Sequence, residues 1–116
     1  MVASESEASK APLVGKPVRG SRTGRPIMAL LDLLGRRWTL RVLWELREGA
    51  SVTFRELQSL TGGVSASVLN DRLRELREVN IVETDSKGYR LTADGRDLVE
   101  SLEPLQVWVQ RWSDET

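Results

Sequence analysis

The 116-residue chain contains neither cysteine nor histidine. Without cysteine, disulfides, thiolate nucleophiles and thiol-based redox sensing are excluded. Without either residue, ordinary zinc sites lack their preferred ligands, and acid–base catalysis lacks its commonest general base. The remaining polar residues form no pattern that is typical of a reaction. We therefore predict that the protein is not an enzyme and that it holds no metal ion or cofactor.

A long hydrophobic run is also missing. The longest apolar stretch, residues 27–34, contains Asp32 and is far shorter than the roughly 20 residues that span a bilayer. The first ten residues carry acidic side chains where a signal peptide would carry positive charge. We expect a cytoplasmic protein without a membrane partner.

The chain has no excess of positive charge, which nucleic-acid-binding proteins usually carry. Its 17 Lys and Arg residues balance its 17 Asp and Glu residues. The distribution is uneven, because residues 1–25 hold five basic residues against Glu5 and Glu7, a net charge of +3, and the rest of the chain is left with −3. A DNA-binding face on the folded part would therefore be a local basic patch.

The length fits a single domain with a tail. Residues 1–25 are rich in Ala, Ser, Gly, Pro and charge, and such a segment cannot bury enough apolar surface to offset the entropy of ordering. We predict a flexible basic N-terminal arm over residues 1–25. The folded domain is expected over residues 26–112.

Periodicity and capping residues predict four helices in the first part of this domain. Pro26 suits a helix start, and Thr53 with Glu56 has the spacing of a capping box. Trp38 and Trp44 are expected inside the second helix, and Leu60 on the buried side of the third. The predicted helices span 26–34, buried on several sides, 37–48, 53–60 and 65–79, with a very short strand possible at residues 51–52.

The second part is predicted to be a hairpin followed by a C-terminal helix. Strands over 81–85 and 89–91 flank the turn Ser86-Lys87-Gly88. Thr92 caps the helix, in which Pro104 predicts a kink or a break. Apolar residues at spacings of four and three form a seam on this helix. We predict a homodimer through the first and last helices, formed by Ile27, Leu30, Leu31, Leu98, Leu102, Leu105, Trp108, Val109 and Trp112.

A helix, a glycine-containing turn, a second helix and a hairpin follow one another in the order of a winged helix-turn-helix. The helix pair alone would also fit a generic bundle. The segments LLDLLGRRWTLRVLWEL, FRELQSLTGGVSASVLNDRLREL and YRLTADGRDL resemble three consecutive blocks of the HxlR-type, MarR-like winged-helix regulators. The resemblance implies an α+β, mostly helical fold, a two-stranded wing, a C-terminal dimerisation helix and a dimeric bacterial transcription factor.

Two departures from this family pattern limit what can be transferred. The hairpin is shorter than is common in the family, so the reach of the wing into the neighbouring groove is not implied. Many members carry a cysteine just before the proline of the first helix, but this chain has Arg25 before Pro26. Sensing through a thiol is therefore not implied. Whether a small-molecule effector exists is left open.

The helix over 65–79 is the predicted recognition helix. At about 100° per residue, Val68, Leu69, Leu73 and Leu76 share one side, and Ser67, Asn70, Asp71 and Arg74 share the other. Asp71 would repel phosphate unless it accepts from a cytosine amino group. The candidate DNA-binding residues are Ser65, Ser67, Asn70, Arg72, Arg74, Lys87 and Arg90.

Each candidate also has a simpler explanation. The outward side of the helix is an ordinary solvated surface in many proteins, Arg72 could form a structural ion pair, and basic residues at hairpin tips often serve solubility. The four tryptophans fit core and dimer packing better than a ligand pocket. The main prediction is a sequence-specific regulator that binds double-stranded DNA; the alternative is a winged-helix module for protein contacts, since fold alone does not fix function.

Overall fold

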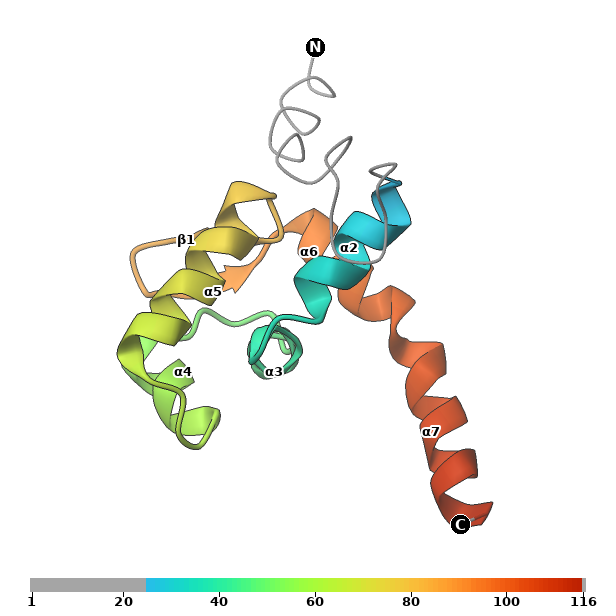
Figure 1. The fold of residues 1–116 in the computed structure, drawn as a ribbon. Coiled ribbons are helices and arrows are strands. Elements are labelled where there is room, and N and C mark those ends of the chain that lie inside the picture. Colours follow the sequence, from blue (N-terminus) through green and yellow to red (C-terminus); the bar gives the residue numbers. More distant parts are fainter. Residues whose placement is uncertain (1–24, 116) are drawn as a thin grey trace.

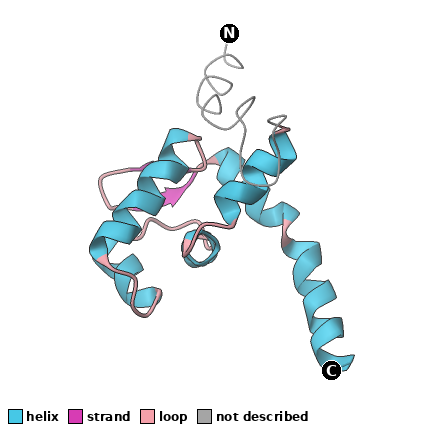
Figure 2. Ribbon diagram, in the orientation of Figure 1, coloured by secondary structure: helices cyan, strands magenta, loops and turns pink. Residues whose placement is uncertain are grey.

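The computed structural model describes residues 25–115 of the chain. Most of the predicted N-terminal arm, residues 1–24, lies outside the described residues. The elements in chain order are α2 (Pro26–Leu34), α3 (Thr39–Glu45), α4 (Phe54–Leu60), α5 (Ala66–Glu78), β1 (Val82–Thr84), β2 (Tyr89–Leu91), α6 (Ala93–Ser101) and α7 (Glu103–Glu115) (Figure 1). Figure 2 shows helices around one small hairpin, which confirms the predicted α+β, mostly helical class. In the described part of the chain, no helix has the length and apolar character needed to cross a membrane.

The core consists mainly of leucine side chains from α2, α3, α4, α5 and β2. On α5, Leu69, Leu73 and Leu76 are buried, as the periodicity predicts, and Val68 packs against the same core from its edge. Burying a leucine contributes roughly 1.5–3 kcal/mol. The fully buried leucines are Leu33, Leu43, Leu46, Leu57, Leu69, Leu73, Leu76 and Leu91.

The two helices of the helix-turn-helix, α4 and α5, begin at the predicted caps. The Glu56 amide donates to Thr53 Oγ1 at 3.1 Å, and the Thr53 amide donates to Glu56 Oε1 at 3.0 Å. Ser65 Oγ accepts from the Val68 amide at 3.2 Å. Each cap satisfies amide groups that the first helical turn leaves without partners, so the start of α5 is set by the local sequence.

The hairpin is antiparallel and is tied to the loop before α4. Val82 pairs with Leu91 and Thr84 with Tyr89. Val52 forms a bridge with Tyr89 through two hydrogen bonds of 2.8 Å, so the strand thought possible at residues 51–52 is reduced to a single bridge residue. The predicted strand over 81–85 is one residue too long at each end, because Ile81 bonds to α5 and Asp85 belongs to the turn.

Three predictions about α3 are wrong. The helix starts at Thr39 instead of residue 37, because Trp38 has a left-handed backbone conformation with φ of 77°. It ends at Glu45, three residues early. Trp44, expected in the core, is 42% exposed and lies under the guanidinium of Arg47 at 3.9 Å. The ring contacts the arginine side chain at the surface and does not belong to the core.

Two further burial predictions are also wrong. Leu60, expected on the buried side of α4, is 47% exposed, because it lies in the last turn before the Thr61-Gly62-Gly63 turn. The helix α2 is buried mainly on one side, through Ala29, Leu33 and Leu34.

The C-terminal helix breaks, as Pro104 predicts. The α6 helix ends at Ser101 and α7 begins at Glu103. Proline lacks an amide hydrogen and is tolerated in the first turn of a helix, so Pro104 fits the start of α7 but not the interior of a continuous helix. The α7 helix then extends away from the rest of the molecule, on the side opposite α5 (Figure 1).

Candidate nucleic-acid interface

The outward face of α5 carries a row of exposed polar side chains. Ser67, Asn70 and Arg74 are exposed and lie opposite the buried leucines of the same helix. Asn70 and Arg74 are one helical turn apart, and Ser67 lies nearly one turn before Asn70. Ser65, the capping residue, is also exposed, with its Oγ 3.5 Å from Ser67 Oγ. The arrangement presents hydrogen-bonding groups along one line at the surface.

Arg74 is held loosely by two acidic neighbours on its own helix. Its Nη1 lies 3.3 Å from Asp71 and its Nε lies 3.7 Å from Glu78, and all three side chains are about half exposed. Exposed ion pairs of this kind contribute only about 0–1 kcal/mol. The guanidinium can therefore exchange these carboxylates for a ligand at little cost.

Arg72 lies behind this face. Its side chain is 18% exposed, and its Nη1 donates to Glu75 Oε1 at 3.1 Å. Arg36, from the connection between α2 and α3, reaches the other oxygen of Glu75 at 3.2 Å. This environment favours the structural ion pair, the alternative that the sequence left open for Arg72.

Within residues 25–115, one basic side chain of the wing is unpaired and one is paired. Lys87 is exposed at the tip, and among residues 25–115 it forms no ion pair with a carboxylate. Arg90 Nε donates to Glu83 at 2.8 Å, and its Nη1 lies 3.5 Å from Asp85. Arg90 therefore braces the two strands of the wing against each other.

Asp85 organises the turn of the wing. Its Oδ1 accepts from the amides of Lys87 and Gly88 at 2.8 and 3.0 Å, and its other oxygen accepts from Ser51 Oγ. The Ser51 hydroxyl, followed by the Lys87 amide, lowers the pKa of Asp85 below its ordinary value. The carboxylate thus fixes the position of the Lys87 backbone and, with it, the direction of the tip.

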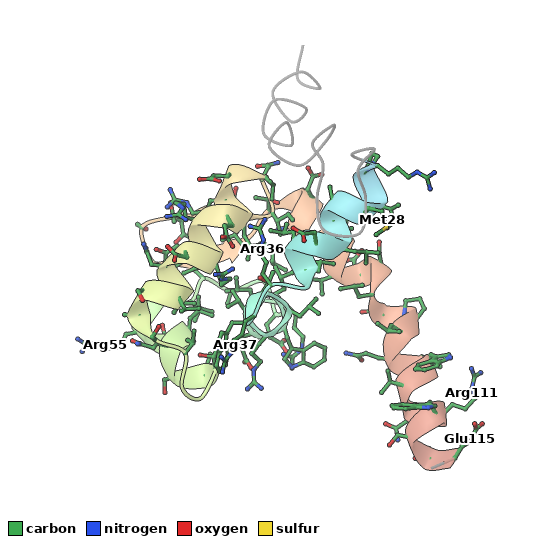
Figure 3. The ribbon with its side chains drawn as sticks, in the orientation of Figure 1. Met28, Arg36, Arg37, Arg55, Arg111 and Glu115 are labelled. Carbon is green, nitrogen blue, oxygen red and sulfur yellow. The ribbon has the colours of Figure 1, made fainter. Side chains whose placement is uncertain are left out.

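The sequence alone did not identify Arg55 in the first turn of α4 or Arg77 in the last turn of α5. Both are exposed, and neither forms an ion pair within the described part of the chain. Figure 3 shows Arg55 projecting from the outer edge of α4, far from Arg111 on α7. The sequence could have indicated Arg55 through its position, because it lies in the first turn of the helix that precedes the recognition helix.

Exposed apolar side chains also lie on α2 and on α7. Every side chain of α7 is exposed, including Leu105 at 55% and Trp112 at 52%, and the rings of Trp108 and Trp112 stack with centroids 5.5 Å apart. We call Ile27, Leu31, Leu105, Trp108, Val109 and Trp112, all exposed, the apolar surface. Of the other predicted dimer residues, Leu30, Leu98 and Leu102 are half-buried, and Leu30 and Leu98 pack against the core.

A groove of about 680 Å³ adjoins this surface. It lies between α3 and the α6–α7 segment, and its walls include Leu40, Trp44, Leu105 and Val109. The groove and the apolar surface share α7 side chains, so whatever covers α7 would also cover part of the groove.

Comparison with known proteins identifies the family. The sequence pattern of the HxlR-like helix-turn-helix family matches residues 33–116. The chain belongs to the HxlR-like helix-turn-helix family. An uncharacterized HTH-type transcriptional regulator of Methanocaldococcus jannaschii is 29% identical to this HxlR-like protein over 90 residues, which cover 75% of this chain and 85% of the relative.

Solved structures agree with the fold of this HxlR-like chain. The quinone-bound YodB from Bacillus subtilis is similar with a TM-score of 0.64 and 28% identity, over 78% of this chain and 97% of YodB. A protein described as a transcriptional regulator of the MarR family, from Enterococcus faecalis, is similar with a TM-score of 0.71 and 25% identity, over 84% of this chain and 94% of that protein. This HxlR-like protein is therefore a DNA-binding transcriptional regulator and not an enzyme.

Proposed function

We propose that this HxlR-like regulator binds double-stranded DNA sequence-specifically as a homodimer in the cytoplasm, with α5 of each subunit in the major groove. The exposed row of Ser67, Asn70 and Arg74 carries this proposal, because it lies opposite the core face of the helix. Asparagine pairs with adenine and arginine with guanine through two hydrogen bonds each. Serine can bond to several bases, so Ser67 would add contact with less selectivity.

Contacts to the DNA backbone would come from the elements beside α5. Lys87 at the tip of the wing and Arg55 on α4 are exposed and unpaired within residues 25–115. Arginine and lysine contacts to phosphate fix orientation without reading bases. In this arrangement Arg90 and Arg72 support the interface through their partners Glu83 and Glu75.

The apolar surface supports the homodimer. A soluble monomer seldom exposes large apolar side chains gathered on one helix, as they are on α7, and a two-fold axis would cover the same residues on both chains. A dimer of this type would place its two α5 helices about 34–36 Å apart, or a multiple of that distance, to match half-sites along the duplex.

A randomised-site selection tests the proposed role of α5. The proteins compared are the wild type, Asn70→Ala, Arg74→Ala and, as a control on the opposite side of the molecule, Arg111→Ala (Figure 3). Asn70→Ala and Arg74→Ala should each flatten the preference at different base pairs, by roughly 1–3 kcal/mol. Arg111→Ala should return the wild-type motif. The same motif from all four proteins would show that α5 does not read the sequence.

Protein contact without DNA remains the competing function, favoured by the net charge of −3 on residues 26–116. The two functions differ in salt dependence, since phosphate contacts release counterions and weaken steeply as salt rises. Failure of the wild type to retard genomic fragments at low salt would favour a protein partner.

A further inference from the structure

One carboxylate joins the recognition helix to the segment that follows α2. Glu75 on α5 uses both of its oxygens: Oε1 accepts from Arg72 Nη1 at 3.1 Å, and Oε2 lies 3.2 Å from Arg36 Nη1. Arg36 also approaches Asp32 of α2, with Nη2 3.5 Å from Oδ2. We call Arg36, Glu75 and Arg72 the Glu75 cluster. It runs from the end of α2 to the middle of α5.

The Glu75 cluster differs from the other ion pairs on the recognition side of the molecule. The pairs of Arg74 and Arg90 stay within one helix or one hairpin, whereas Arg36 and Glu75 belong to separate elements. The Arg72 and Glu75 side chains are only 18% and 19% exposed. Partly shielded charges interact more strongly than exposed ones, and a guanidinium holds its acceptors in a fixed planar geometry.

Within the Glu75 cluster, Glu75 is the acceptor for the Arg72 guanidinium. Arg72 Nε is buried and donates to no acceptor within residues 25–115. Its remaining charge-assisted contact with Glu75 is therefore the one that holds the guanidinium in place. Loss of the Glu75 charge would leave two arginines close together without the carboxylate between them.

We propose that Glu75 is a positioning residue that fixes the orientation of α5 relative to α2. The inference rests on the proposed dimer, because α2 contributes Ile27 and Leu31 to the apolar surface. If α2 packs at the two-fold axis, the angle between α2 and α5 sets the separation of the two recognition helices. Glu75 thereby determines which half-site spacing the dimer accepts, without touching DNA.

The absence of cysteine makes a direct measurement possible. A single Ser67→Cys substitution, on the exposed face of α5, places one spin label on each subunit, and pulsed dipolar spectroscopy gives the distance between the two labels in the full-length dimer. The backgrounds are the otherwise unchanged chain, Glu75→Gln, Arg36→Met and Glu45→Gln. Glu45 is the matched control, since its side chain is 15% exposed and its ion pair with Arg41, at 2.8 Å, stays within α3.

The expected result is a narrow distance distribution for the unchanged chain and for Glu45→Gln. Glu75→Gln and Arg36→Met should broaden this distance distribution or shift its maximum. In binding assays on DNAs that differ in half-site spacing, the same two variants should lose about threefold or more of their preference for the best spacing. Glu75→Gln and Glu45→Gln remove the same charge, so a general gain in DNA affinity would appear in both and cancel in the comparison.

Each outcome decides the proposal. Distributions that are the same in all folded proteins, or equal broadening in Glu45→Gln, would overturn it. If Glu75→Gln fails to fold by circular dichroism, Arg36→Met decides, because it keeps the Arg72–Glu75 pair. If the labelled Ser67→Cys protein without a second substitution gives no dipolar signal, the result would contradict the dimer of the proposed function. A clear signal that Glu75→Gln and Arg36→Met leave unaltered would contradict only the role of Glu75.

Discussion

Gly88 in the wing lies directly against the backbone of Val52. A Cβ atom added to Gly88 would stand 2.3 Å from the Val52 carbonyl oxygen and 2.9 Å from the Thr53 amide nitrogen. Both contacts are to backbone, which cannot rotate away. The glycine therefore allows the wing to dock on the loop that precedes α4.

Gly88→Ala should detach the wing from this loop. Gly63→Ala is the matched control, because Gly63 has a similar φ of 144°, against 151° for Gly88, and its added Cβ would meet nothing within 4 Å. Backbone strain is thus common to both variants, and only Gly88→Ala adds the collision. We expect Gly88→Ala to be less stable than Gly63→Ala by about 1–3 kcal/mol in chemical unfolding. Equal losses would show that the close approach is unimportant.

The wing should also lose stability in acid through Asp85. Hydrogen bonds from Ser51 and the Lys87 amide lower the pKa of Asp85 from 3.8. A carboxyl group whose pKa is lower in the folded state stabilises the fold above its unfolded pKa, and this contribution disappears as the pH falls toward the folded pKa. The free energy of unfolding should therefore fall more steeply below pH 3.8 in the wild type than in Asp85→Asn.

Ser51→Ala tests the cause of this shift, because Ser51 makes the largest contribution to it. The variant should lose part of the acid dependence that Asp85→Asn loses. Glu56 also has a lowered pKa, through its bonds with Thr53, but it is present in all three proteins and cancels in the comparison. Identical pH profiles for the three proteins would contradict the assignment to Asp85.

Elements with local chemical signals could be predicted from the sequence. The start of α4 depends on Thr53 and Glu56, and the start of α5 depends on Ser65, each through bonds that span three residues. The break before α7 follows from Pro104 alone. Such features depend on residues close together in the chain, so the sequence shows them directly.

Features set by tertiary contacts could not be predicted in this way. The left-handed backbone of Trp38 shortens α3, although tryptophan has no special preference for that conformation. Likewise, the outward face of α5 followed from helical periodicity, but the partner of Arg72 did not, since Arg36 comes from another element. Sequence spacing indicates which side of a helix a residue lies on, but it does not identify the residues of other elements that the side chain contacts.

The apolar surface should control the oligomeric state. Leu105→Asp places a charge among its exposed side chains and should reduce the mass in light scattering from two chains to one. Leu60→Asp is the control, because Leu60 is similarly exposed but lies on α4, away from α7. It should stay dimeric. A wild-type monomer at micromolar concentration, or a folded Leu105→Asp with unaltered mass, would contradict the predicted dimer.

DNA binding should be insensitive to thiol oxidants. The chain has no cysteine, and diamide and mild peroxide act reversibly on thiols. Treated and untreated protein should therefore bind the selected DNA with equal affinity. Arg25→Cys, which introduces one exposed thiol before Pro26, shows by its change in mass that the reagent was active. Rapid loss of binding in the wild type that a reducing agent reverses would contradict this expectation.

The basic side chains beside α5 should affect the salt dependence of DNA affinity and not the preference for particular base sequences. Lys87 and Arg55 are exposed without a carboxylate partner in residues 25–115, so a bound phosphate would be their first ionic contact. Each phosphate contact adds close to one counterion to those released on binding. Lys87→Ala and Arg55→Ala should each weaken binding to all sequences alike and reduce the slope of log affinity against log salt by about one.

Arg111→Ala removes the same charge from α7, on the other side of the molecule (Figure 3), and should leave the slope unchanged. Arg90→Ala distinguishes a direct phosphate contact from structural support of the wing. Because Arg90 is already paired with Glu83 at 2.8 Å, its loss should disturb the wing without removing a phosphate contact. The DNA affinity of Arg90→Ala should fall, while its slope of log affinity against log salt stays near the wild-type value. A slope that drops equally for Lys87→Ala, Arg55→Ala and Arg111→Ala would mean that net charge, and not a local basic face around α5, governs the binding of DNA.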